Sequence, residues 1–286
     1  MDQAQHIKAT IERITNIPTL PTVITKISKL LQNPQTSAEE IGKVITTDQA
    51  LASKVLKLVN SAFYGFPGKI STITHAIVIL GFSTVANIVL TASILDVFKR
   101  PGSEAPDFDM QQFWMHSISC GAAAQAIAKF TGSPEKEECF IAGLVHDIGK
   151  IILCQYQPET FAQIVADVRQ KDCLFYESEI NLFKFTHQEV GGLLADRWNL
   201  PKNLASAIKF HHQPMPSRDH YTMTAVVHTA DIFVRALDFG NGGDAKIPLL
   251  SENVWNNLGL QNANLLQLFA NITDEIERAT IFMQLV

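Results

Sequence analysis

Apolar residues recur at helical spacing along almost the whole chain, and no stretch shows the alternation of apolar and polar residues that is typical of a half-buried strand. In the segment 20–32, for example, Val23, Ile27 and Leu30 fall on one stripe of a helix. Ser37 and Glu40 have the spacing of a capping box at the start of the next helix. The pattern therefore predicts an all-α fold with more than ten helices.

Breaks in the pattern, at proline, glycine and clusters of polar residues, set the expected helix limits. The loop 60–68 is expected to separate two N-terminal helices. The predicted helices cover residues 3–16, 20–32, 37–45, 48–59, 110–130, 135–153, 158–171, 175–183, 187–198, 201–210, 221–239 and 253–284.

The segment 76–95 has no charged residue and is long enough to span a bilayer. Serine, threonine and asparagine dilute it, however, and the run Gly81-Phe82-Ser83 suggests a break, with Ser83 as a helix cap. We therefore predict two buried helices here and no membrane contact. The N-terminus lacks the pattern of a signal peptide, and the four cysteines are widely spaced, so a reducing, cytoplasmic location is expected.

A polar stretch with two prolines and a glycine, residues 99–109, is the best candidate for a linker. It would separate an N-terminal subdomain, 1–98, from a second subdomain, 110–240. The glycine-rich run 239–244 predicts a second, flexible break. Residues 241–286 would then form a helical extension, as an added layer or a docking surface.

Composition and charge narrow the choice of function. The 286 residues are 47% hydrophobic and 18% charged, which is typical of a globular chain. The formal charge is −5, so a broad basic surface for duplex nucleic acid is not expected.

Candidate chemistry is concentrated in the histidines. His146 and Asp147 are adjacent at the end of an apolar helical run. A buried carboxylate is costly unless something neutralises it, and a metal ion does so directly. Lys150 places a cation one turn away, which suits an anionic ligand such as phosphate. A hydrogen-bonded His-Asp pair without metal is the simpler alternative.

Further histidines weaken that simpler alternative. Mixed imidazole and carboxylate ligands suit iron, manganese, cobalt, nickel or zinc. We interpret His228 as structural and Asp231, three residues later on the same helix face, as the better ligand candidate. The remaining candidates at helix positions are His116, His187, His211 and His212, whereas His6, His75 and His220 are expected to be structural or surface residues.

The chain resembles the HDOD-domain family of the HD superfamily, which is related to HD-GYP phosphodiesterases. The resemblance covers about residues 15–240 and rests on IPTLPTV, DQALASKVLKLVNSAFY, I-x-T-I-x-x-A-I-x-x-L-G-F and LVHDIGK. It implies an N-terminal helical HDOD subdomain packed on an HD-type helical core. Many members of the family lack the full set of HD metal ligands, and this chain departs from that trend.

The resemblance also implies a ligand set. A first divalent metal would take His116, His146, Asp147 and Asp231. A second would share Asp147 as a bridge and take His187, His211 and His212. Iron or manganese would be favoured, as one or two ions, with Asp147 and Lys150 as the catalytic residues. After His211-His212 the sequence continues Gln-Pro-Met-Pro, without the Gly-Tyr-Pro motif, which argues against cyclic-dinucleotide hydrolysis.

Three functions follow. The first is a bacterial signal-transduction module that binds a regulatory protein partner or a nucleotide and keeps a metal site, expected to be dinuclear. The alternative is a metal-dependent phosphohydrolase or phosphodiesterase acting on a nucleotide or cyclic dinucleotide. The third is oxygen chemistry at a di-iron site. An open metal position and a cleft would favour an enzyme, whereas a shielded site would favour a module.

Overall fold

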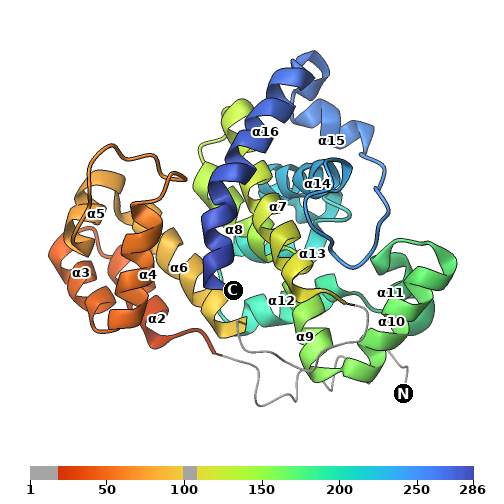
Figure 1. Ribbon diagram of the computed structural model, residues 1–286, viewed down its shortest axis with the longest axis horizontal. Coiled ribbons are helices and arrows are strands. Elements are labelled where there is room, and N and C mark those ends of the chain that lie inside the picture. The colour runs from red at the N-terminus through yellow and green to blue at the C-terminus, as the bar shows by residue number, and fades with distance from the viewer. Residues whose placement is uncertain (1–18, 99–107) are drawn as a thin grey trace. The chain divides into compact units, whose positions relative to one another are not determined.

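The computed structural model describes residues 19–98 and 108–286, which form helices and connecting loops with no strand among them (Figure 1). The all-α prediction is therefore confirmed. The described residues fall into two compact units: an N-terminal unit, residues 19–98 with 277–286, and a histidine unit, residues 108–276. The predicted helix 3–16 and almost all of the predicted linker 99–109 lie outside the described residues.

The N-terminal unit is a bundle in which α6 packs against α2, α4 and α5. The 3-10 helix η3 of the C-terminus belongs to this unit and packs on α4 and α6, where Phe282 meets Phe63 edge to face. The elements of this unit are α2 (Thr22–Leu31), α3 (Ala38–Thr46), α4 (Gln49–Val59), α5 (Ile73–Leu80), α6 (Phe82–Phe98) and η3 (Thr280–Leu285).

Side-chain caps fix the helix starts in this unit, as the sequence predicts. Ser37 accepts a hydrogen bond from the backbone of Glu40, and Glu40 accepts one from the backbone of Ser37. Asp48 caps α4 by accepting from the backbone of Leu51. Each cap satisfies an amide that has no partner inside its own helix.

The uncharged segment 76–95 is broken at Gly81, as predicted. Gly81 has a φ of +86°, which ends α5 and lets α6 begin at Phe82, one residue before the expected cap Ser83. By length and composition, the helical stretch Lys136–Tyr156 could cross a membrane, but 89% of the apolar window in it is buried inside the structure. The core helices of soluble proteins pass the same test.

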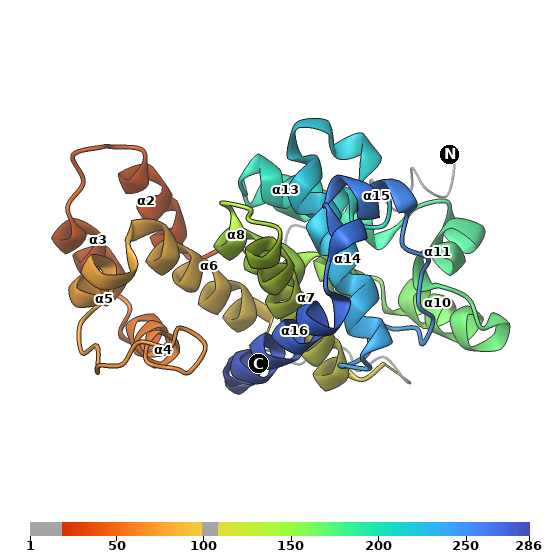
Figure 2. The same ribbon diagram turned by 90° about the horizontal axis from the view of Figure 1, so that it is seen from above.

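In the histidine unit α7 lies beside both α8 and α14 (Figures 1 and 2). Helix α12 packs against α9 and α13 (Figure 1). The elements of this unit are α7 (Met110–Phe130), α8 (Lys136–Val145), α9 (Ile148–Tyr156), α10 (Pro158–Lys171), α11 (Phe175–Phe183), α12 (His187–Arg197), α13 (Lys202–Phe210), η1 (Met215–His220), α14 (Tyr221–Ala236), α15 (Glu252–Asn257), η2 (Leu260–Asn262) and α16 (Leu265–Ala279), whose last residues pass into the N-terminal unit.

Two predicted helices are wrong in extent. The helix expected over 135–153 is interrupted at His146-Asp147, where Asp147 takes the non-helical angles φ −96° and ψ 10°. The helix expected over 253–284 is four shorter helices. The first break lies at Gly259, whose φ of +69° is not helical. Apolar spacing continues across both breaks, so periodicity alone does not reveal them.

The run 239–244 is not a flexible break. We call it the strap, because it is fixed at both ends in the histidine unit. The backbone amide of Asn241 donates to the carbonyl of Gln112, and Asp244 accepts from the backbone amide of Phe175. Gly242 and Asp244 are buried. The glycines give this segment close contact with its neighbours, and that contact holds it in place.

Candidate metal centre

The structure brings the seven sequence-predicted ligands into two adjoining groups within the histidine unit. In each group the candidate ligand atoms lie within 4.8 Å of one another. His212 is half-buried and the other six are buried. The first group is His116, His146 and Asp231, joined by Cys120, and the second is Asp147, His187, His211 and His212.

The interruption between α8 and α9 explains how two adjacent residues serve one centre. Neighbours on a continuous helix point about 100° apart. Here His146 follows the end of α8 and Asp147 precedes α9, so their side chains converge, with His146 Nε2 3.3 Å from Asp147 Oδ2. Gly149 makes this junction fit, because a Cβ there would lie 2.0 Å from the carbonyl oxygen of His187.

Backbone acceptors orient the imidazole rings. His146 Nδ1 lies 2.6 Å from the carbonyl oxygen of Gly143, and His211 Nδ1 lies 3.0 Å from that of Ile208. A carbonyl accepts only from a protonated nitrogen, so each ring carries its proton on Nδ1 and its lone pair on Nε2. Both lone pairs are therefore directed at the centre.

His187 is held by a carboxylate instead. Glu179 accepts from the backbone amide of His187 at 2.9 Å and lies 2.7 Å from its Nδ1, and both side chains are fully buried. Burial by itself would lower the pKa of His187, but the Glu179 charge raises that pKa above its ordinary value. A carboxylate behind a ligand histidine is a usual arrangement at metal sites.

Three other histidines of the centre, His116, His211 and His212, are neutral at ordinary pH. Burial, reinforced by neighbouring His146, lowers the pKa of His211 to about 3. Burial also lowers the pKa of His116 and holds that of His212 well below its usual range. These rings need not lose a proton before they bind a cation.

Asp147 lies between a fixed cation and the ring nitrogens. Lys150 Nζ donates to Asp147 Oδ2 at 2.7 Å, and both groups are fully buried. The other oxygen, Oδ1, lies 3.0 Å from His187 Nε2 and 3.5 Å from His211 Nε2. Burial would raise the pKa of Asp147, but His146 and the Lys150 ammonium hold it well below its usual range. The carboxylate is ionised.

Asp231 is bound by a residue that the sequence analysis missed. Arg235, one helical turn later on α14, donates through Nε to Asp231 Oδ1 at 2.7 Å and through Nη1 to Asp244 Oδ1 at 2.7 Å. Burial would raise the pKa of Asp231, but the Arg235 charge and His116 hold it well below its usual range. The spacing of four residues between Asp231 and Arg235 was a signal that could have identified the pair.

Cys120 and Glu179 were also missed. Cys120 Sγ lies 3.5 Å from His116 Nε2, one turn along α7. Burial raises the pKa of the Cys120 thiol well above its usual range. The spacing His116-x-x-x-Cys120 puts both on one helix face, which the sequence alone shows, whereas nothing local links Glu179 to His187.

The strap covers the centre. Lys150 Nζ donates to the carbonyl oxygen of Gly242 at 2.8 Å. A Cβ on Gly242 would lie 3.2 Å from His116 Nε2 and 3.3 Å from Asp147 Oδ2. Glycine at position 242 thus lets the backbone lie directly against both candidate ligands.

The donor set fits a divalent metal ion. Within the described residues, Asp147 Oδ1 and His146 Nε2 are buried and have no hydrogen-bond partner. His187 Nε2 lies 3.2 Å from the Nε2 atoms of both His211 and His212. Buried polar atoms are normally paired, and a cluster of lone pairs around one carboxylate oxygen is what a borderline metal binds.

Histidines outside the two groups are placed as expected where the structure describes them. His228 Nδ1 lies 2.7 Å from the carbonyl oxygen of His211, which supports the end of α13. His75 is exposed and His220 is half-buried. His6 lies outside the described residues.

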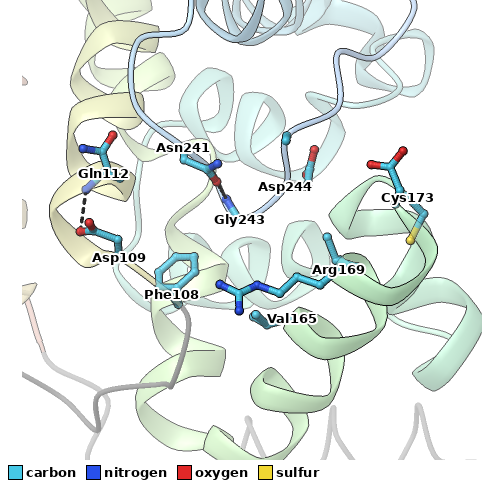
Figure 3. Close-up of a pocket in the computed structure, with 12 residues that line it drawn as sticks. Phe108, Asp109, Gln112, Val165, Arg169, Cys173, Asn241, Gly243 and Asp244 are labelled. Atoms are coloured by element: carbon cyan, nitrogen blue, oxygen red, sulfur yellow. Dashed lines mark hydrogen bonds between the residues drawn. The ribbon is translucent and has the colours of Figure 1, made fainter.

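A pocket of about 340 Å³ opens on the outer side of the strap, between α10 and the start of α7 (Figure 3). Arg169 of α10 extends across it toward Phe108, while Asn241 and Gly243 of the strap form its other wall (Figure 3). The same short segment thus contacts the candidate ligands on one side and borders a pocket on the other.

Comparison with solved structures identifies similar folds. A crystal structure of an HDOD domain protein with unknown function from Geobacter sulfurreducens is 26% identical, with a TM-score of 0.76, and the match covers 98% of this chain and 96% of that one. A protein described as a "Putative phosphohydrolase" from Shewanella amazonensis SB2B is 22% identical, with a TM-score of 0.74 and 97% of each chain covered. At that identity the second match shows the fold alone.

Sequence comparison gives a relative and a family. An uncharacterized protein of Treponema pallidum (strain Nichols) is 28% identical over 229 residues, which are 79% of this chain but 44% of that protein. The chain therefore corresponds to less than half the length of this relative. The model of the HDOD domain matches residues 17–214, well over half of the chain. This chain belongs to the HDOD family.

Proposed function

We propose that the chain is a signal-transduction module of the HDOD family that holds a divalent metal ion in a buried structural or sensory site. Iron or manganese is the proposed metal, and a reducing compartment such as the cytoplasm is the proposed location. The module would act by binding a regulatory protein partner or a nucleotide and shifting the arrangement of its helices.

The centre is shielded from solvent, and this shielding is the main support for the proposal. His116, His146, Asp147, His187 and His211 are fully buried. The strap lies against His116 and Asp147, and the Lys150 ammonium donates to Asp147 Oδ2 and to the Gly242 carbonyl. A catalytic metal needs an open position and a cleft for the substrate, and a structural site does not.

The pocket beyond the strap supports a nucleotide as the ligand of the module. Its volume of about 340 Å³ falls within the usual range for small-molecule sites. The Arg169 guanidinium suits a phosphate group, and the Phe108 ring offers a face for a base. A ligand seated there would touch Asn241 and Gly243 of the strap directly, and so influence the metal centre.

Metal content and turnover, measured on the same preparation, test the proposal. After anaerobic loading with Fe²⁺ or Mn²⁺ and removal of free ion, the purified chain should retain metal, and Asp147→Ala should lose it. The loaded chain should hydrolyse neither nucleotides nor cyclic dinucleotides above the rate of the Asp147→Ala variant. Metal-dependent turnover that disappears in the variant would reject the module in favour of an enzyme.

A phosphohydrolase is the second candidate, because Lys150 and the ionised Asp147 carboxylate lie beside the candidate ligands. Bound metal would supply a hydroxide nucleophile and polarise a phosphoryl oxygen. Lys150 would offset charge developing on the phosphate, once the strap had moved away. A phosphohydrolase would require the strap to open for the substrate. Binding of a substrate analogue should therefore increase hydrogen exchange at residues 239–244. Unchanged exchange there would count against the phosphohydrolase.

A further inference from the structure

Among the buried side chains around the centre, negative charges outnumber positive ones. In the described part of the chain, the side chains of four carboxylates and two cations lie buried around the histidines. Four negative and two positive charges leave a net charge of minus two when the imidazoles are neutral, which is their form when they bind an ion. The groups are Asp147, Asp231, Glu179, Asp244, Lys150 and Arg235.

One divalent ion would balance this charge. Two would leave two positive charges among side chains that are buried from solvent. Uncompensated buried charge is costly because neither solvent nor a counter-ion stabilises it. The charge balance therefore favours a single ion.

Arg235 already supplies a positive charge to the carboxylate of the first group, Asp231. Its Nε donates to Asp231 Oδ1, and that same oxygen is the one that faces His116 Nε2, at 3.2 Å, and His146 Nε2, at 3.9 Å. The guanidinium is also held by Asp244. The other carboxylate oxygen near this group, Asp147 Oδ2, lies 3.3 Å from His146 Nε2 and accepts from Lys150 Nζ. An ion here would therefore share each of these two oxygens with a fixed positive charge.

The second group has no such competitor on the oxygen that faces it. Lys150 binds Asp147 through Oδ2, whereas Oδ1 has no hydrogen-bond partner among the described residues. His187 and His211 direct Nε2 at that oxygen, and His212 Nε2 lies 3.2 Å from His187 Nε2. One carboxylate oxygen and three imidazoles make a complete ligand set for a borderline metal.

We propose that this chain binds one divalent ion, held by Asp147, His187, His211 and His212, and that Arg235 supplies at Asp231 the positive charge that a second ion would bring. The inference rests on the proposed metal centre and specifies its nuclearity. It departs from the dinuclear site that the sequence resemblance implies.

Metal stoichiometry of the full chain tests the inference directly. After loading with excess Mn²⁺ and desalting, elemental analysis should find about one equivalent per chain, with the electron paramagnetic resonance spectrum of isolated Mn²⁺ rather than of a coupled pair. Arg235→Met removes the charge and keeps an apolar stem of similar length. It should raise the content to about two equivalents and produce the coupled spectrum, whereas Arg235→Lys should stay at one.

A second pair of variants keeps the test decisive if Arg235→Met does not fold. His211→Ala should lose the ion, and His116→Ala should retain it. Two equivalents in the unmodified chain, falling to one in His116→Ala, would overturn the single-ion inference and leave the metal centre standing. One equivalent in a folded Arg235→Met would overturn the role of Arg235. Absence of bound metal in the unmodified chain would overturn both the inference and the proposed centre.

Discussion

At the scale of single residues, the centre depends on groups behind the ligands as much as on the ligands. Carbonyl oxygens of Gly143 and Ile208 fix the rings of His146 and His211, and Glu179 fixes that of His187. Each of these contacts sets which nitrogen carries the proton. The lone pairs that face Asp147 therefore follow from where α8 and α13 end.

The raised pKa of His187 predicts the pH dependence of metal binding. An ion must displace the proton from His187, so affinity should rise about tenfold per pH unit below that pKa and level off above it. His116, His211 and His212 have lowered pKa values and should release no proton near neutrality. Calorimetry in two buffers of different ionisation enthalpy should measure about one proton released per ion.

The variant Glu179→Gln tests whether the Glu179 charge is what raises the pKa of His187. Removing the charge that raises the pKa of His187 should reduce proton release and flatten the pH profile. Loss of the carboxylate that orients His187 should also weaken metal affinity by about 10- to 100-fold. Equal proton release in the variant and the parent chain would show that Glu179 does not set the protonation of His187.

At the scale of elements, caps and strained glycines decide where helices begin and end. The capping box of α3 satisfies two amides through Ser37 and Glu40. Ser37→Ala should lower the free energy of unfolding of the N-terminal unit by about 1 kcal/mol, measured by denaturant titration. Glu40→Gln keeps an acceptor at the same position and should cost clearly less; an equal loss in both variants would contradict the cap as the cause.

The strap is the element on which the shielding depends. Gly243 has a φ of +112°, and a Cβ there would lie 2.9 Å from Phe175 Cδ2. Gly243→Ala should therefore loosen the strap, speed hydrogen exchange at residues 239–244 and accelerate loss of metal to a chelator.

The neighbouring exposed residue Ala245 provides a matched control. Ala245→Ser changes the residue that follows the strap without strain and should leave exchange and metal release as in the parent chain. If Gly243→Ala behaves like this control, the strap does not close the centre.

At the scale of the whole molecule, the ion should stabilise the histidine unit, because its proposed ligands come from the junction of α8 and α9, the start of α12 and the end of α13. An ion bound to the native state alone contributes about 2.7 kcal/mol when its free concentration is 100 times its Kd. For a unit of this size, chelation should lower Tm by about 5–10 °C in differential scanning calorimetry. Asp147→Ala should show no response to the chelator.

Much of the fold could be predicted from apolar spacing and local breaks. The predicted ranges 110–130, 158–171 and 175–183 coincide with α7, α10 and α11. The two errors share one cause, since apolar residues continue across the breaks at His146-Asp147 and around Gly259. At His146-Asp147 both neighbouring helices are also buried, so the periodicity carries no signal of the break between them.

The all-α class, the family and the identity of the candidate ligands could be predicted before the structure was known, because they depend on residue types and on spacing along the chain. The surroundings of those ligands could not, because they depend on the tertiary structure. Glu179, Arg235 and the strap reach the centre through packing between helices distant in sequence, and burial turns their charges into strong constraints. Local spacing cannot reveal that the glycines of 239–244 close a site, since the residues that hold the strap lie on other elements.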